Sequence, residues 1–327
     1  MGITNRIYYL DVLRIIATLM VVMIHTSGML IQETDKGTFD YWVGICNFEI
    51  VRCAVPLFFM ISGALLLNPK YLTTPKNMMM KVIRVIVIML FWSFVYSFFT
   101  CKDITLKSIL FSTIKGPFHF WFFNYLIGLY LLTPLFKVIV NYKNGELVKY
   151  YLLLFTIFGI GISSLQSIDI CNKWIMDVTT KVHIELMGFS GYFFLGYYLS
   201  ERKTIVSTEL IILILIVTYI TQGIISQNAT LLYDSDKWWI FTFVESICIY
   251  LIIKGLATTN VGKKIIFCSS LTMGIFILHP LFLWLIPLYM WNVKYYLLDV
   301  LFVCICSTIC SFIIYKIPYI GKKLISL

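Results

Sequence analysis

Three titratable side chains, Asp11, Arg14 and His25, lie within one apolar run near the N-terminus, IYYLDVLRIIATLMVVMIHTSGML. On a helix, Asp11 and Arg14 are i,i+3 neighbours that can form an ion pair. The eleven residues from Arg14 to His25 turn the helix by about 1100°, close to three full turns, and rise about 16 Å. The three groups therefore share one face. A neutral imidazole there could act as a general base toward a hydroxyl group.

A structural interpretation of the same residues stays open. A buried ion pair could simply be satisfied inside the protein, with the His25 side chain reaching out to the far membrane surface. Titratable groups facing lipid are costly, so in either case we expect Asp11, Arg14 and His25 to face the interior of a helix bundle.

Further polar residues stand near the ends of other apolar runs. Lys81 and Arg84 lie one turn apart at the start of a helix, where two cations could bind phosphates or could act only as topology anchors. Glu49 and Arg52 are i,i+3 neighbours that could pair with each other or bind a sugar. His119 precedes Trp121 at the outer end of an expected helix, a position equally suited to an aromatic belt and to the rim of an active site.

Two more interior residues are noted. His279 precedes Pro280 within an apolar run, where we expect it to satisfy a backbone carbonyl that the proline leaves without a donor. Glu245 lies deep in another apolar run and needs a partner that the sequence does not identify.

The elements that carry these residues are membrane helices. Hydrophobic residues make up 60% of the 327 positions and charged residues only 13%, which excludes a soluble globular protein. A spanning helix needs about 20 apolar residues. We expect an all-α fold, a polytopic membrane bundle of about ten transmembrane helices, at 7–29, 47–67, 81–101, 119–140, 147–166, 184–200, 205–226, 238–258, 266–290 and 295–316.

The cations report the orientation of this bundle. Of the 26 Lys and Arg residues, sixteen fall in the terminal and connecting segments on the side of the N-terminus and eight on the opposite side, while Arg14 and Arg52 lie in or at spans. The positive-inside rule therefore predicts that both termini are cytoplasmic. The formal charge of +10 reports topology and contact with the lipid bilayer, so we expect no nucleic-acid partner.

The chain is expected to form a single domain, 1–327, with no soluble extracytoplasmic domain. The nine cysteines lie mostly within spans and form no CxxC pair and no Cys/His cluster of metal-ligand spacing, so we expect no metal site. The sequence does not establish whether any disulfide forms.

Several segments together resemble a known family. The Asp11, Arg14 and His25 pattern, VRCAVPLFFMISGALLL from Val51, the Lys81 to Arg84 pair, and three later segments all match in order. The later segments are HFWFFNYLIGLYLLTP from His119, GYFFLGYYL from Gly191 and GIFILHPLFL from Gly274. Over nearly its whole length, the chain resembles the acyltransferase-3 family of integral-membrane O-acyltransferases.

The resemblance implies a transfer of an acyl group, most commonly acetyl, from cytoplasmic acyl-CoA directly onto a hydroxyl of an extracytoplasmic glycan. It implies His25 as the general base. Arg14 would orient the channel or contact the thiol end of the cofactor, with Asp11 holding the Arg14 guanidinium in place. It further implies that Lys81 and Arg84 bind the cofactor, acetyl-CoA as the acyl donor. Arg52, Glu49 and His119 are the acceptor-side candidates. The expected location is a bacterial plasma (inner) membrane.

Two other functions remain open. Interior Asp, Arg, Glu and His side chains would also suit a transporter or permease for a small polar solute, although the paired broken helices typical of many transporters are not seen. An acyltransferase acting on a lipid or a small secreted molecule would differ only in its acceptor groove. The acceptor, the acyl length, the oxyanion donor and the oligomeric state are not encoded in a recognisable pattern.

Overall fold

A computed structural model describes residues 6–71, 73–101, 103–162, 164, 188–226, 240–256 and 262–326. Throughout these ranges the chain is helical and contains no β-strand. The expected outer connections at 167–183 and 227–237, the start of the expected span 184–200 and Cys171 lie outside the described residues.

Among the residues that the structure describes, six helical stretches are long and apolar enough to cross a membrane. They are α1 (Tyr8–Glu33), α2 with α3 (Phe39–Val51 and Ala54–Leu66), α4 (Pro75–Thr100), α5 through α6 (Leu106–Lys115 and Trp121–Asn141, joined by the 3-10 turn η2, Phe118–Phe120), α13 (Lys263–Leu283) and α14 (Val293–Lys316). The protein is therefore a multi-pass membrane protein.

The other expected spans coincide with shorter helices. The 3-10 turn η3 (Tyr142–Gly145) leads into α7 (Glu146–Leu154), which continues as the π-helical segment η4 (Phe155–Ile162). The remaining helices are α10 (Ser190–Ser200), α11 (Thr208–Ser226), α12 (Ile240–Leu256), the turn η6 (Leu288–Met290) and α15 (Gly321–Ile325). The helical fold agrees with the sequence analysis, whereas ten complete spans remain an expectation.

The expected helix at 47–67 is interrupted. It is divided at Arg52 and Cys53, between α2 and α3. Pro56, in the first turn of α3, has no N–H and so cannot donate to the carbonyl of Arg52 four residues before it. The helix is locally tightened there, since the Arg52 N–H donates to the carbonyl of Glu49 at 3.3 Å. The break places the Glu49 and Arg52 side chains at a helix end inside the bundle.

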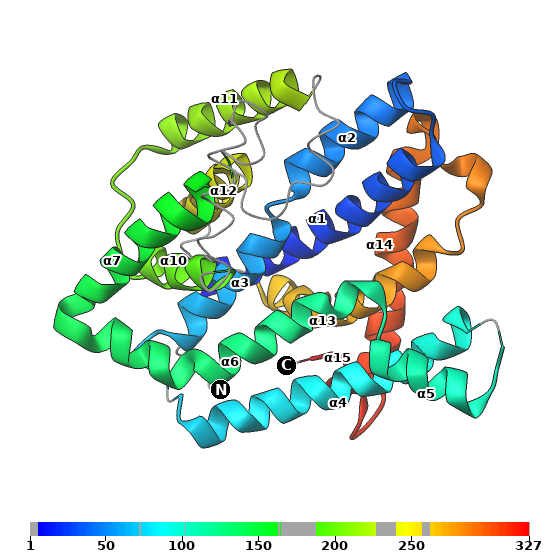
Figure 1. The fold of residues 1–327 in the computed structure, drawn as a ribbon, viewed down its shortest axis with the longest axis horizontal. Helices are drawn as coiled ribbons and strands as arrows, with labels where there is room; N and C mark the ends of the chain where they lie inside the picture. The colour runs from blue at the N-terminus through cyan, green and yellow to red at the C-terminus, as the bar shows by residue number, and fades with distance from the viewer. Residues whose placement is uncertain are drawn as a thin grey trace, which may run out of the picture.

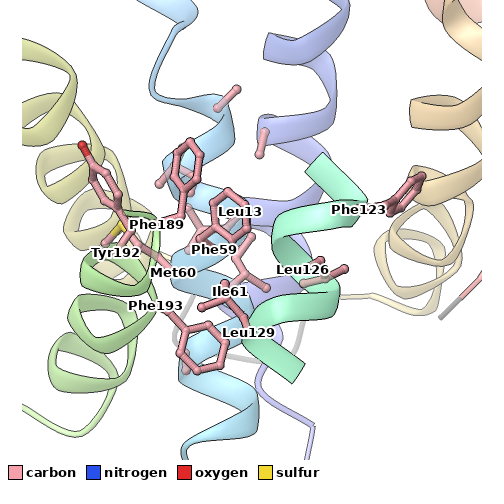
Figure 2. Close-up of a cluster of buried hydrophobic side chains, with 14 of the residues drawn as sticks. Leu13, Phe59, Met60, Ile61, Phe123, Leu126, Leu129, Phe189, Tyr192 and Phe193 are labelled. Carbon is pink, nitrogen blue, oxygen red and sulfur yellow. The ribbon is translucent and has the colours of Figure 1, made fainter. Parts of the chain in front are cut away.

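α1 lies at the centre of the fold, in contact with α2, α3, α12, α13 and α14 (Figure 1). This position explains why a helix carrying Asp11 and Arg14 is tolerated in a membrane protein, since neighbouring helices surround it. Around its inner half, side chains of α1, α3, α6 and α10 form an apolar core that includes Leu13, Phe59 and Leu126 (Figure 2).

α3 and α10 pack with their backbones in contact. A Cβ added at Gly63 would lie 1.7 Å from the carbonyl oxygen of Phe193, and one at Gly196 would lie 2.0 Å from that of Met60. Glycine is thus required on both sides of this crossing, and small residues are common where two membrane helices approach closely.

The two ends of the described chain lie near each other (Figure 1). The indole N–H of Trp92 in α4 donates to the carbonyl of Leu324 in α15 at 2.9 Å, which holds the C-terminal segment under the bundle. Arg6 and Ser326 line one cavity. That both termini are cytoplasmic remains an expectation.

Candidate functional site

The polar group on the inner half of α1 is centred on Asp11, which is almost fully buried. Arg6 binds this carboxylate with two hydrogen bonds, from Nε at 2.6 Å and from Nη2 at 2.9 Å. Ser269 of α13 adds a third, from its hydroxyl to Oδ1 at 2.7 Å. Arg14 forms a longer ion pair with Asp11, at 3.7 Å, and donates to Ser269 Oγ at 3.3 Å.

The expected Asp11 to Arg14 pair is therefore present, but Arg6 is the closer partner of the carboxylate. Helix spacing could not predict this contact, because Arg6 precedes the helix and the i,i+3 rule applies only within it. Ser269, 258 residues away along the chain, could be found only through the packing of α1 on α13.

A cavity of about 650 Å³ opens beside this polar group. Three cations line it: Arg6, Arg14 and Lys81. Its other polar lining includes Tyr71, Thr73, Tyr130, Ser270 and Ser326. The volume falls in the range of sites that hold drug-sized ligands or cofactors. The anionic groups of a ligand could bind Arg6, Arg14 and Lys81, at the end of the cavity near the chain termini.

The opposite end of the cavity is aromatic. Phe58 of α3, Phe122 and Phe123 of α6 and Phe276 of α13 line it. The Phe276 ring lies 5.4 Å from those of both Phe122 and Phe123, and Phe58 lies 5.8 Å from Phe122, measured between ring centres. We call these four residues the aromatic layer. It forms the apolar inner end of the cavity.

Lys81 and Arg84 have different surroundings. Lys81 lines the cavity, with its Nζ 5.9 Å from the centre of the Tyr130 ring. Arg84 is exposed and does not line the cavity, and it shares an exposed strip of α4 with Met80, Val87 and Phe91. On such a strip, the guanidinium can reach the lipid headgroups.

Beyond the aromatic layer, three histidines from three elements meet. The ring centre of His25 lies 5.0 Å from that of His279, which in turn lies 5.6 Å from that of His119. Phe276 of the aromatic layer lies 5.7 Å from His119 and 6.0 Å from His279. We call these three residues the histidine cluster. The sequence predicted His25 and His119 as site residues but gave His279 only a structural role.

The three imidazoles differ in exposure and hydrogen bonding. His25 is half-buried, whereas His119 and His279 are buried. Nδ1 of His279 bonds the carbonyl of Ile275 at 3.2 Å, one residue before the Phe276 carbonyl that Pro280 leaves without a donor. Neither ring nitrogen of His119 has a hydrogen-bond partner in the described part of the chain. The nearby Ile277 carbonyl instead accepts from Tyr96 at 2.7 Å.

The histidine cluster does not line the cavity, because the aromatic layer separates the two. Phe276 and its neighbours therefore lie between a group bound in the cavity and His25.

Glu49 and Arg52 form a separate polar cluster near α11 and α12. Arg52 Nη1 donates to both oxygens of Glu49, at 2.9 and 3.2 Å, and Gln222 Nε2 donates to Oε2 at 2.8 Å. Glu245 of α12 interacts electrostatically with both Glu49 and Arg52. It is fully buried, and neither of its carboxyl oxygens has a hydrogen-bond partner among the described residues.

Within the described ranges, no group of three His, Cys, Asp or Glu side chains is arranged to hold a metal ion. The arrangement thus offers a cation-lined cavity on one side of an aromatic layer and neutral imidazoles, suited to proton transfer, on the other.

A known family model covers nearly the whole chain. The Acyl_transf_3 family model, described as an acyltransferase domain, matches residues 7–316, nearly the whole chain. No curated protein and no solved structure matches the chain.

Proposed function

The chain belongs to the acyltransferase-3 family of membrane acyltransferases, and from that premise we propose that it moves an acetyl group from cytoplasmic acetyl-CoA onto a hydroxyl of an extracytoplasmic glycan. A bacterial plasma membrane is the proposed location. The observation that carries the proposal is the order of parts along the bundle. A cation-lined cavity, an aromatic layer and a histidine cluster follow one another from the side of the two termini.

The cavity suits an acyl-CoA in charge and polarity. The phosphates of CoA would meet Lys81, Arg6 and Arg14, which supply charge-assisted hydrogen bonds. The less polar pantetheine arm and the thioester would extend along the apolar lining of α3 and α6 toward the aromatic layer. Arg84 would contribute from the lipid-exposed side, through the electrostatic attraction of the cytoplasmic surface for anions.

His25 is the proposed general base, because it is the only half-buried member of the histidine cluster. A nitrogen of His25 takes the proton of the acceptor hydroxyl while the oxygen attacks the thioester carbonyl. The tetrahedral intermediate then collapses, the C–S bond breaks, and the CoA thiolate takes the proton from His25. An acetyl ester and free CoA are the products.

Arg14 and Asp11 support the donor side in this proposal. Arg14 faces the cavity and lies on the same face of α1 as His25, about 16 Å below it. Asp11 holds Arg6 and Arg14 in place through its hydrogen bonds and ion pair. On the acceptor side, His119 is the best placed of the candidates, since it lies in the histidine cluster. Glu49 and Arg52 would contact a more distant part of a glycan.

The test is transfer of labelled acetyl from acetyl-CoA by the purified protein in lipid nanodiscs, with an extract of cell-surface glycan as acceptor. Wild type is expected to label the glycan and release CoA in proportion. His25→Ala is expected to lower the rate by a factor of about 10² to 10⁴, the usual contribution of a general base. Acetyl-CoA affinity should not change, because His25 does not line the cavity.

His25→Gln is the matched control, because glutamine keeps a hydrogen-bonding group but cannot take a proton. Near-normal transfer by this variant would assign His25 to orienting the acceptor. Uptake of a polar solute into sealed vesicles without CoA release would favour a transporter, and labelling of a lipid fraction would favour a lipid acceptor.

A further inference from the structure

His279 has one ring nitrogen whose protonation is fixed by the structure. Its Nδ1 bonds the carbonyl oxygen of Ile275 at 3.2 Å. A carbonyl can only accept, so Nδ1 carries the hydrogen. In a neutral imidazole the other nitrogen, Nε2, then carries a lone pair.

This lone pair is buried and unused. His279 has no exposed surface, and Nε2 has no hydrogen-bond partner in the part of the chain that the structure describes. A buried acceptor without a hydrogen-bond donor destabilises the folded protein. Such a cost within a cluster of histidines indicates that a donor reaches the nitrogen in another state of the protein.

The ring of His25 is the nearest of the other two imidazoles. Its centre lies 5.0 Å from that of His279, and the two ring planes are inclined by 30°. No ion pair or hydrogen bond joins His25 to a carboxylate within the described ranges. In well-studied catalytic triads, a carboxylate accepts the second N–H of the histidine and fixes its tautomer. Here His25 has no such carboxylate.

We propose that His279 is the positioning residue for His25, with His279 Nε2 accepting the N–H of His25. This inference rests on the proposed function. The hydrogen bond would leave the other nitrogen of His25 unprotonated and directed at the acceptor hydroxyl. When that nitrogen takes the hydroxyl proton, His279 stabilises the charge on His25. The proton later passes from His25 to the CoA thiolate, and His279 ends as it began.

Two substitutions separate this role from a purely structural one. The side-chain amide nitrogen of His279→Asn can replace Nδ1 and keep the bond to Ile275, but it supplies nothing at the place of Nε2. In His279→Gln the longer side chain can place its amide oxygen where Nε2 accepts. A positioning role is rescued by glutamine, whereas a structural role is rescued by asparagine.

We expect His279→Gln to keep kcat within about tenfold of wild type. His279→Asn is expected to lose on the order of a hundredfold, within the range typical of proton-transfer catalysis. KM for acetyl-CoA should stay unchanged in both, since His279 does not line the cavity. The opposite order, or full activity in both variants, would overturn the proposal.

A second measurement needs no turnover. Carbethoxylation of His25 by diethylpyrocarbonate, followed by peptide mass spectrometry, reports the nucleophilicity of its free nitrogen, which a hydrogen bond at the other nitrogen increases. The rate is expected to fall several-fold in His279→Asn and to remain in His279→Gln and in His119→Phe. Equal rates in all variants would refute the contact, even if wild type transferred acetyl normally. A chain that transfers no acetyl but shows the expected order of rates would refute the proposed function alone.

Discussion

The guanidinium group of Arg6 donates two hydrogen bonds to the Asp11 carboxylate, whereas Arg14 lies 3.7 Å from the same carboxylate. The Arg14 side chain therefore remains part of the cavity lining. Neutralising the buried carboxylate and binding an anionic ligand are two different roles, which a single arginine paired with Asp11 would not fill together. Arg6 neutralises the buried carboxylate, and Arg14 remains able to meet an anionic ligand.

Asp11→Asn is expected to destabilise the protein by about 1 to 3 kcal/mol, because two guanidinium groups lose their shared counter-charge in a partly buried site. Arg14→Gln should destabilise less, since Arg6 still satisfies the carboxylate. Thermal unfolding of the detergent-solubilised variants measures both. Equal losses would mean that Arg14, and not Arg6, is the main partner of Asp11.

Lys81→Ala is expected to weaken acetyl-CoA binding about tenfold or more, because a charge-assisted hydrogen bond contributes about 1.5 to 3 kcal/mol. Arg84→Ala, the matched control one turn away, should change the affinity by less than about threefold, since Arg84 does not line the cavity. Isothermal titration with acetyl-CoA compares the two. A larger effect of Arg84 would place the phosphates at the lipid-exposed strip of α4.

Phe276→Ala is expected to raise acetyl-CoA hydrolysis in the absence of any acceptor. Removing this ring joins the cavity to the histidine cluster and gives water access to a thioester near His25. Phe58→Ala is the control, because Phe58 lines the same cavity but contacts Phe122. Release of free thiol, followed by a chromogenic reagent, measures the reaction. No excess hydrolysis over Phe58→Ala would mean that Phe276 is not the barrier.

Glu245→Met is expected to stabilise the protein by about 1 to 3 kcal/mol, because it removes a buried carboxyl that no described residue hydrogen-bonds. Glu49→Met should destabilise it, since that carboxylate accepts from Arg52 and Gln222. The unfolding temperatures of the two variants, compared with that of wild type, test both expectations. A loss of stability in Glu245→Met would reveal a partner that holds the carboxyl.

The topology prediction is tested with single cysteines in a background that lacks the nine native ones. Asp35, between α1 and α2, and Lys76, at the start of α4, are both exposed and lie at opposite ends of the bundle. An impermeant maleimide applied to intact cells is expected to label position 35 and not position 76. The reverse pattern would invert the proposed orientation and put the cavity mouth on the outer side.

Periodicity on single helices predicted much of the site. The face shared by Asp11, Arg14 and His25 follows from the helix repeat alone, and α1 indeed lies inside the bundle. Periodicity on one helix could not predict the contacts between helices that are distant in the sequence. His279 meets His25 only because α13 packs on α1, and Phe276 enters the path for the same reason.

The i,i+3 spacing rule also does not predict on which side of a helix each member of a pair lies. Lys81 and Arg84 differ by about 60° around the helix axis. On a helix that borders a cavity, this angle is enough to put Lys81 on the lining and Arg84 on the exposed strip. Similarly, the apolar run at 47–67 predicted one helix, because hydropathy does not register the missing N–H of Pro56.

The close packing of α3 on α10 at Gly63 and Gly196 makes one wall of the cavity more rigid than the opposite wall. α3 supplies Phe58 and Ile61 to the cavity lining. On its other face, Gly63 contacts the α10 backbone, so α3 cannot move away from the cavity. The facing wall is built differently. Pro134 of α6 and Pro280 of α13 remove the backbone donors for the carbonyls of Tyr130 and Phe276, four residues earlier, and both of these residues line the cavity. A larger acyl group would therefore be accommodated more easily by movement of α6 and α13 than by movement of α3, so the flexibility of these two helices would affect the length of acyl chain accepted.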